Sequence, residues 1–352
     1  MVASFKKHTL NFINPGGTSR GVLHTKDSWF IMLSNKPNGE QVGIGECSII
    51  PKLSIDDVPE LEQVIAETIE ELNFRFQISN FKLACTELRQ LIFNFQFSIF
   101  NYPALRFALE TALLDLENGG VRTLFPSAFT RGEASIPING LIWMGDFNAM
   151  WQQAEQKTKD GFSVLKMKIG ALDFDEEMYF VAQLRKHFPQ IELRLDANGG
   201  FPLEEALERL QALSQFNIHS VEQPIKQKNI SQMAKLCKRS PVDIALDEEL
   251  IGVETRHATS LLQAIKPQYI ILKPSLLGGF RACEEWSSTA EQQGIRWWAT
   301  SALESNIGLN AIAQWVFTKN NPLPQGLGTG GVFANNVKMP LQVEQGNLKC
   351  RI

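Results

Sequence analysis

Apolar and polar positions follow two different patterns along the chain, and the pattern changes near residue 134. Between residues 1 and 46, short alternating runs flank Asn38-Gly39, a dipeptide that favours tight turns, and they predict an antiparallel meander. Three stretches with apolar residues on one helical face follow, at about 57–74, 81–95 and 103–117. Strands followed by a separate group of helices predict an α+β domain.

After residue 134, short β-rich runs alternate with helical stretches, which predicts parallel strands joined by crossover helices. The number of runs favours a closed barrel over an open sheet. An eighth strand is expected near Gln325–Leu327, and the tail from about Gly331 is expected to pack back on the first domain. The seven runs are Ser135–Ile138, Val164–Ile169, Glu192–Asp196, Ser220–Glu222, Asp243–Leu246, Tyr269–Leu272 and Arg296–Ala299.

A chain of 352 residues exceeds what one simple core usually fills. We therefore predict an α/β protein in three parts. An α+β capping domain covers 1–125, a (β/α) barrel of the TIM type covers 126–330 and carries the catalytic site, and a C-terminal tail at 331–352 packs on the capping domain.

Composition and charge narrow the range of partners. The formal net charge of −4 gives no electrostatic reason to bind nucleic acid or an anionic membrane, and no apolar run suits a signal peptide or a membrane span. The five cysteines are far apart and never form a C-x-x-C pair, so neither disulfides nor a zinc site is indicated. We expect a cytoplasmic protein that acts on a small molecule; the sequence does not indicate its oligomeric state.

Charged residues follow the predicted strands at nearly constant intervals. Asp196, Glu222, Asp247 and Lys273 are separated by 26, 25 and 26 residues, and Lys168 precedes Asp196 by 28. If each interval is one strand with its helix, these side chains come from consecutive units. They would then point into the carboxyl-terminal mouth of the barrel, where barrel enzymes place their active sites.

Three carboxylates in one mouth would repel one another unless a cation neutralised them. A hard divalent cation does so and leaves coordination positions for water or substrate. The ligands are all oxygens, which disfavours zinc, so we expect Mg²⁺, with Mn²⁺ as a substitute, bound by Asp196, Glu222 and Asp247. The alternative, that each acid only caps a helix or ends a strand, fits the regular spacing less well.

Three lysines supply candidates for proton transfer. Lys166 and Lys168 are two residues apart, so both enter the barrel from one strand face. An ordinary lysine has a pKa near ~10.4, and both Lys166 and the metal would favour the neutral, basic form of Lys168. Lys273 faces the same mouth from the other side of the metal. It is expected to act either as a second base or as a cation that stabilises developing negative charge.

The same period-two spacing places Arg194, Asp196 and Asn198 on one strand face. An arginine inside a barrel is costly to bury unless it meets an anion, so Arg194 is predicted to hold a substrate carboxylate. The alternative is that Arg194 pairs with one of the acidic metal ligands. Glu248, next to Asp247, points the other way and is expected to support the site without binding the metal.

Over nearly the whole chain, the combined motifs resemble the enolase superfamily. Lys-x-Lys, Asp-x-Asn, Glu-Gln-Pro, Asp-Glu and Lys-Pro-Ser occur in that order and spacing, and the chain is similar to the muconate-lactonising-enzyme subgroup. The resemblance implies a (β/α)7β barrel with a capping domain closed by the C-terminal tail. It also implies that Mg²⁺ stabilises an enediolate after Lys168 removes an α-proton, with Lys273 on the opposite face of the substrate.

Within the subgroup, motifs at 194–198, 301–308 and 326–329 resemble the o-succinylbenzoate synthase family, a group of hydro-lyases of menaquinone biosynthesis. Their substrate is a small carboxylate, 2-succinyl-6-hydroxy-2,4-cyclohexadiene-1-carboxylate. The resemblance implies that Lys168 returns the proton to the departing hydroxyl while Lys273 stays protonated. The residues it implies in substrate binding are Arg194, Asn198, Ser301 and Gly326, with Thr18 and Arg20 in a capping loop.

Several other activities stay open from the sequence. The segment at 326–329 lacks the Asp-x-Asp pair that dipeptide epimerases use there, and Ala302 replaces a second serine of some synthases, so the succinyl contacts can differ. N-acylamino acid racemisation and muconate cycloisomerisation use the same lysines. A Schiff-base aldolase or lyase also places a lysine in a barrel mouth, but it has no need of three evenly spaced carboxylates.

Overall fold

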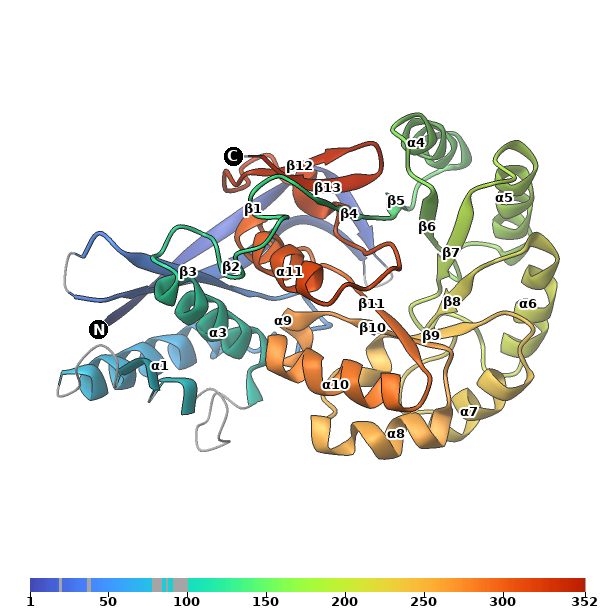
Figure 1. The fold of residues 1–352 in the computed structure, drawn as a ribbon. Helices are drawn as coiled ribbons and strands as arrows, with labels where there is room; N and C mark the ends of the chain where they lie inside the picture. Colours follow the sequence, from blue (N-terminus) through green and yellow to red (C-terminus); the bar gives the residue numbers. More distant parts are fainter. Residues whose placement is uncertain (19–20, 37–38, 78–83, 87, 91–100, 352) are drawn as a thin grey trace.

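The computed structural model spans residues 1–352 and describes all of them except 19–20, 37–38, 78–83, 87, 91–100 and 352. Two groups of elements lie side by side in Figure 1: an antiparallel sheet with helices, formed by the N-terminal part of the chain, and a parallel sheet surrounded by helices. Among the described helices, none is long and apolar enough to cross a membrane.

The N-terminal group is built on a three-stranded antiparallel sheet of β1 (Val2–Thr18), β2 (Gly21–Ser34) and β3 (Val42–Ser48). Helices α1 (Leu61–Phe76) and α3 (Pro103–Glu117) share its hydrophobic core, and residues 84–86 and 88–90 are also helical. The predicted meander and the helices predicted at 57–74 and 103–117 are therefore present, as β1–β3, α1 and α3. Most of the helix expected at 81–95 lies outside the described residues.

Two glycines of β3 allow α3 to lie very close to the sheet. A Cβ atom on Gly43 would lie 2.0 Å from the carbonyl oxygen of Ala112, and one on Gly45 would lie 1.8 Å from that of Ala108. Any larger residue would push the helix away. The close contact fixes the position of α3, which also touches the barrel elements through its buried Glu110.

The second group is a parallel sheet of seven strands, which lie in the order in which they occur along the chain. Helices outside the sheet connect the strands (Figure 1), the arrangement of a β/α barrel. The strands are β5 (Gly140–Ile142), β6 (Val164–Lys168), β7 (Glu192–Asp196), β8 (Ser220–Glu222), β9 (Ile244–Leu246), β10 (Tyr269–Leu272) and β11 (Arg296–Ala299). The helices are α4 (Phe147–Lys159), α5 (Phe174–His187), α6 (Ala206–Leu213), α7 (Ile230–Arg239), α8 (Ala258–Ile265), α9 (Pro274–Leu277), α10 (Phe280–Gln292) and α11 (Asn306–Thr318).

Two single bridges, rather than a regular strand, mark the place of the expected eighth strand. Gln325 pairs in parallel with Ile138 beside β5, and Gly326 pairs in parallel with Thr300 at the end of β11. Main-chain hydrogen bonds accompany both bridges. The segment therefore contacts the chain at both edges of the seven-stranded sheet.

The prediction of a first barrel strand at 135–138 is wrong. β4 (Ser135–Pro137) pairs antiparallel with β13 (Asn347–Cys350), which pairs with β12 (Leu341–Glu344), and the parallel sheet begins at β5. A run of four residues carries too little periodicity to reveal its partner. The tail thus forms a small sheet beside the start of the parallel sheet.

Residues at the start of the tail also contact the N-terminal group. Phe12 of β1 lies edge-on against Phe333, with ring centroids 4.7 Å apart, and Phe333 is buried together with Leu10 and Leu303. This small core joins β1 to the segment that follows β11.

Candidate active site

The three predicted metal ligands lie at adjacent strand ends. Asp196 ends β7 in register with Glu222 at the end of β8, and Asp247 follows β9 directly. Lys168 ends β6 in register with Asp196. The three acidic residues are only 2–3% exposed. The regular spacing in the sequence thus corresponds to one buried cluster at the carboxyl ends of the strands.

Lysine ammonium groups lie between these carboxylates. Lys166 Nζ is 3.0 Å from Asp196 Oδ2 and also donates a hydrogen bond to Glu222. Lys273, which follows β10, donates to Asp247 Oδ2 at 2.5 Å. Among the described residues, no three acidic, histidine or cysteine side chains are grouped as a ready-made metal site. The three carboxylates and three lysines of this cluster balance in formal charge.

The ionic surroundings shift pKa values in this cluster in different directions. Burial alone would raise the pKa of Asp196, but the attraction of the lysines outweighs it and holds that pKa well below its ordinary range. Burial and the neighbouring Asp196 raise the pKa of Glu222 well above its usual value. Burial lowers the pKa of Lys166 and of Lys273, but nearby carboxylates more than offset this effect, so both pKa values are raised.

Asn198 links Lys168 to an acidic residue behind the cluster. Its Oδ1 accepts a hydrogen bond from Lys168 Nζ, and its Nδ2 donates to Glu248 Oε1 at 3.1 Å. The φ of Asn198 is +43°, a conformation that asparagine tolerates better than most residues. Asn198 therefore orients Lys168, and Glu248 lies in the supporting position that the sequence suggests.

A cavity of about 110 Å³ opens at these strand ends. Lys168 and Lys273 line it together with Asp196, so the two lysines reach one space from β6 and from the end of β10. Ile50 and Leu53 of the segment after β3 form part of its apolar wall. The stretch after β3 is thus in contact with the cavity.

Ser301 and Gly326, both expected to bind substrate, line the same cavity. Ser301 Oγ donates to Glu304 Oε2 at 2.6 Å and accepts hydrogen bonds from Thr329 Oγ1 at 2.8 Å and from Leu303 N at 3.1 Å. These contacts fix the serine at the end of β11.

Arg194 does not reach the cavity, and its predicted role is corrected. It is 1% exposed, donates to Glu192 Oε1 at 2.9 Å and to Pro324 O at 2.8 Å, and its guanidinium lies 4.4 Å from the centroid of the Trp298 ring. It precedes Asp196 by two residues on β7, so its Cα lies about 7 Å further along the strand from the barrel mouth than that of Asp196. Its counterion is Glu192 rather than one of the three acidic residues at the strand ends.

Two further residues expected to bind substrate cannot be assigned a contact. Arg20 lies outside the described residues. Thr18 is the last residue of β1 and pairs with Gly21, and its side chain is not described. Both assignments stay predictions.

The sequence-based prediction missed a buried polar network between the N-terminal strands and the barrel. Glu46 of β3 accepts hydrogen bonds from Ser305 N at 2.9 Å and Gly308 N at 3.0 Å, at the start of α11. Lys26 of β2 is buried nearby, and burial lowers its pKa despite the attraction of Glu46 and Glu304. The available signal was a pair of oppositely charged residues, Lys26 and Glu46, in two strands of the predicted meander.

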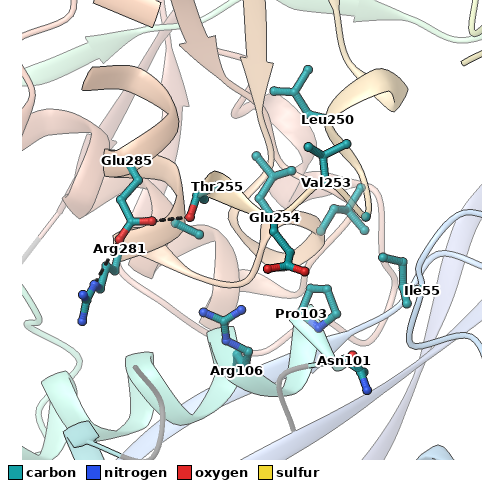
Figure 2. Close-up of a pocket in the computed structure, with 14 residues that line it drawn as sticks. Ile55, Asn101, Pro103, Arg106, Leu250, Val253, Glu254, Thr255, Arg281 and Glu285 are labelled. Carbon is teal, nitrogen blue, oxygen red and sulfur yellow. Dashed lines mark hydrogen bonds and ion pairs between the residues drawn. The ribbon is translucent and has the colours of Figure 1, made fainter. Parts of the chain in front are cut away.

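A second cavity, of about 390 Å³, lies at the contact between the two groups of elements (Figure 2). Pro103 and Arg106 of α3 line one side, and Glu254 and Thr255 line the other. Glu285 accepts a hydrogen bond from Thr255, so part of this wall is already paired. The predicted catalytic lysines line the 110 Å³ cavity instead.

Comparison with known proteins agrees with this geometry. Residues 149–351 match the family model described as enolase C-terminal domain-like, which covers more than half of the chain. The chain therefore belongs to the enolase superfamily. Within it, the chain is 46% identical to the o-succinylbenzoate synthase of Desulfotalea psychrophila, over 99% of this chain and 98% of that protein. The resemblance seen in the motifs is thus confirmed.

Solved structures give the same result for the fold. The crystal structure of MenC from Desulfotalea psychrophila matches with a TM-score of 0.87 and 43% identity, and 99% of each chain is covered. A dipeptide epimerase from Enterococcus faecalis, solved in complex with Mg and a dipeptide, matches with a TM-score of 0.80 over 99% of this chain and 96% of that one. At 21% identity, this second match shows a shared fold only.

Proposed function

We propose that this protein catalyses the o-succinylbenzoate synthase reaction, the loss of water from 2-succinyl-6-hydroxy-2,4-cyclohexadiene-1-carboxylate in menaquinone biosynthesis. The observation that carries the proposal is the position of two lysines, from β6 and from the end of β10, on one cavity beside three buried carboxylates. The 46% identity over almost the full length of both proteins favours this reaction over the others of the superfamily.

The donor chemistry of the three carboxylates suits Mg²⁺, with Mn²⁺ as a substitute, while lysine ammonium groups lie between them in this structure. Glu222 Oε1 is buried and has no hydrogen-bond partner among the described residues, although Lys273 Nζ lies 3.9 Å away, so this oxygen is available to a ligand of the site. Asp196, Glu222 and Asp247 offer only oxygen atoms, the ligands that hard divalent cations prefer. A cation held by these three residues would stabilise the negative charge that develops on the substrate carboxylate as its α-proton leaves.

Lys168 is the residue that moves the proton in this proposal. Its Nζ is held by Asn198 and lies 3.8 Å from Asp196 Oδ2, at the wall of the cavity. It takes the α-proton of the substrate and returns it to the hydroxyl group, which leaves as water when the carbon–oxygen bond breaks. Lys166 forms ion pairs with Asp196 and Glu222, and these pairs keep the Asp196 carboxylate in place.

Lys273 acts as a cation on the other side of the substrate. Its ion pair with Asp247 holds the ammonium group at the cavity, where it stabilises the enediolate electrostatically. In a racemase of the same subgroup this lysine would also have to exchange a proton. Whether Lys273 exchanges protons therefore separates dehydration from racemisation.

A direct assay tests the proposed function. Purified protein with Mg²⁺ should convert the cyclohexadiene carboxylate to o-succinylbenzoate, and no turnover would contradict the proposal. Incubation of an N-succinylamino acid in deuterated water tests the racemase alternative, which predicts deuterium in the recovered amino acid. Borohydride trapping of a substrate adduct with full activity in EDTA would favour a Schiff-base lyase instead.

We also propose that the barrel is closed, and we propose the boundaries of its parts, its partner and its location in the cell. The bridges of Gln325 and Gly326 to both sheet edges support closure into a (β/α)7β barrel, with parts at 1–125, 126–330 and 331–352. A small carboxylate is the proposed partner, with no nucleic acid or membrane involved. A cytoplasmic location is also proposed, and the five free, buried cysteines are consistent with a reducing compartment.

A further inference from the structure

The wall of the active-site cavity has a charged side and a neutral side. The charged side comes from the ends of β6, β7 and β10, with Lys168, Asp196 and Lys273. The neutral side comes from the chain directly after β11, with Thr300 and Ser301, from the bridged residues 325–326, with Gly326, and from the chain before β5, with Asn139. Because the reacting end of a substrate belongs at the lysines, the far end of its side chain meets the neutral wall.

Ser301 has no hydrogen-bonding capacity left for a substrate. A carboxylate oxygen only accepts hydrogen bonds, so the Ser301 hydroxyl must donate to Glu304. Both lone pairs of Ser301 Oγ are then taken, by Leu303 N and by the hydroxyl of Thr329. Since a hydroxyl offers one donor and two acceptor sites, Ser301 is fully saturated.

Two other polar groups on this wall lack partners. Thr300 Oγ1 and Asn139 Oδ1 are buried, and neither makes a hydrogen bond in the described part of the protein. Asn139 is only 4% exposed, yet it lines the cavity. A buried polar group without a partner costs about 1–3 kcal/mol, a cost that a water, an ion or a ligand can remove by supplying the partner.

Gly326 lies directly against the Thr300 side chain. It pairs with Thr300, while its neighbour Gln325 pairs with the chain beside Asn139. A Cβ atom at Gly326 would lie 2.6 Å from Thr300 Oγ1, so any other residue would displace the Thr300 side chain. Residues 325 and 326 thus connect the backbone beside Asn139 to Thr300.

We propose that Thr300 and Asn139, rather than Ser301, bind the terminal carboxylate of an acyl side chain on the substrate. The Thr300 hydroxyl and the amide N–H of Asn139 are the donors, and the nitrogen and oxygen of that amide can exchange places by rotation of the side chain. This inference rests on the proposed function, whose substrate carries a succinyl group. Ser301 instead positions the end of β11 through Glu304, which also accepts a hydrogen bond from Ser275 near Lys273.

The experiment compares two ligands that differ only at the end of the side chain. The affinities of o-succinylbenzoate and of o-butyrylbenzoate, which has a methyl group in place of the terminal carboxylate, are measured by titration calorimetry with Mg²⁺. Thr300→Val and Asn139→Leu should each weaken binding of o-succinylbenzoate about ten- to hundredfold, the range for a hydrogen bond to a charged group. Binding of o-butyrylbenzoate should change less than about threefold. Equal losses for both ligands, or no loss, would overturn the inference.

Thermal stability and Ser301→Ala provide the matched controls. Because Thr300 Oγ1 has no hydrogen-bond partner among the residues that the structure describes, Thr300→Val should leave the melting temperature unchanged or raise it. Ser301→Ala should lower the melting temperature, since it removes a donor from Glu304, and should keep the preference for the succinyl ligand. A Ser301→Ala variant that lost this preference without loss of stability would assign the carboxylate to Ser301.

Product formation by the wild-type protein separates this inference from the proposed function. If the wild type makes o-succinylbenzoate but the Thr300 and Asn139 variants keep the ligand preference, only the inference fails. If the wild type makes no product, the proposed function fails. A wild type that does not prefer the succinyl ligand over the butyryl ligand contradicts the inference, whatever its turnover.

Discussion

Buried carboxylates in two regions of the molecule obtain their partners in different ways. At the barrel mouth, Asp196 and Asp247 meet lysine ammonium groups. Between the N-terminal elements and the barrel, Glu46 and Glu110 accept hydrogen bonds from backbone N–H groups at the starts of α11 and α10. Side-chain ion pairs can be exchanged for a metal ion or a substrate, whereas backbone donors are fixed. The first region can therefore change its charge distribution, and the second holds helices in place.

Asp56 adds a third case of the second kind. It accepts hydrogen bonds from Ala104 N at 3.0 Å and Leu105 N at 3.3 Å at the start of α3. Three helices at the contact between the two groups thus begin on a carboxylate from another part of the chain. Such acids accept hydrogen bonds from N–H groups that have no partner within the helix, and they stabilise the positive end of the helix dipole. We expect changes at the mouth to affect activity and metal binding, and changes at the helix starts to affect stability.

The largest effect is expected from Lys168→Ala. Loss of a general acid and base costs about 10²- to 10⁴-fold in kcat, while the unfolding free energy and the affinity for Mg²⁺ should change little. Steady-state kinetics and thermal unfolding with and without Mg²⁺ measure both quantities. Lys159→Ala, at the exposed end of α4, is the control. Near-normal turnover of the Lys168 variant would remove its assignment as the base.

The pH dependence of stability should depend on Glu110. Burial raises the pKa of this carboxyl from 4.5 to about 7. Because the folded pKa is raised, its contribution to stability is fully present below about pH 4.5 and is lost as the pH rises to about 7. The total change is up to about 3 kcal/mol. Glu110→Gln cannot titrate, so the wild type should lose stability relative to this variant over that pH interval.

Urea unfolding between pH 4.5 and 8 measures this difference. Groups at the barrel mouth titrate equally in both proteins and cancel in the comparison. If the stability curves of the wild type and of Glu110→Gln run parallel with pH, Glu110 keeps an ordinary pKa. The contact region would then be purely structural, and its contrast with the titratable mouth would be sharper.

Mg²⁺ should stabilise the wild type and not the Asp247→Asn variant. At a Mg²⁺ concentration 100 times Kd, linkage predicts about 2.7 kcal/mol of added stability. Asp247→Asn removes one of the three carboxylates, so its melting temperature should respond much less to the same concentration. Asp243→Asn, at the other end of the same strand segment, is the matched control. An equal response in both variants would place the metal elsewhere.

The sequence predicts the mouth better than the contact region, for a physical reason. Parallel strands in a barrel bring equivalent positions together, so constant spacing is sufficient to place Asp196, Glu222 and Asp247 side by side. The period of two gives the face of a strand but not the depth along it, which is why Arg194 was assigned to the cavity although it lies one layer below. For Lys168 and Lys273, the predicted strand ends were sufficient to place both side chains at the barrel mouth.

Contacts between segments that are far apart in the sequence produce no local sequence pattern from which they could be predicted. The pairing of β4 with β13 joins residues more than 200 positions apart, and Glu46 meets Ser305 from another group of elements. The unpaired state of Thr300 and Asn139 depends on what surrounds them in three dimensions. Such features follow from packing, so they could not be predicted before the structure was known.

The smallest effect is expected from Glu46→Gln, which tests the second region directly. The Glu46 carboxylate accepts hydrogen bonds from Ser28 Oγ, from Ser305 N and Oγ and from Gly308 N. A neutral amide keeps the size of the side chain but weakens these charge-assisted hydrogen bonds. Its NH₂ group also faces a backbone N–H donor, with which it cannot form a hydrogen bond. The unfolding free energy should fall by about 1–3 kcal/mol, the cost of poorly satisfied buried hydrogen bonds.

The outcome for Mg²⁺ decides what a loss of stability at Glu46 means. If the two regions are independent, Glu46→Gln lowers the unfolding free energy measured in urea but keeps the full stabilisation by Mg²⁺, whereas the exposed control Glu40→Gln changes neither. Additivity is expected because the two sites share no hydrogen-bond partner among the described residues. A variant that lost stability and Mg²⁺ response together would show that the helix starts also set the geometry of the mouth, and the contrast between the two regions would no longer hold.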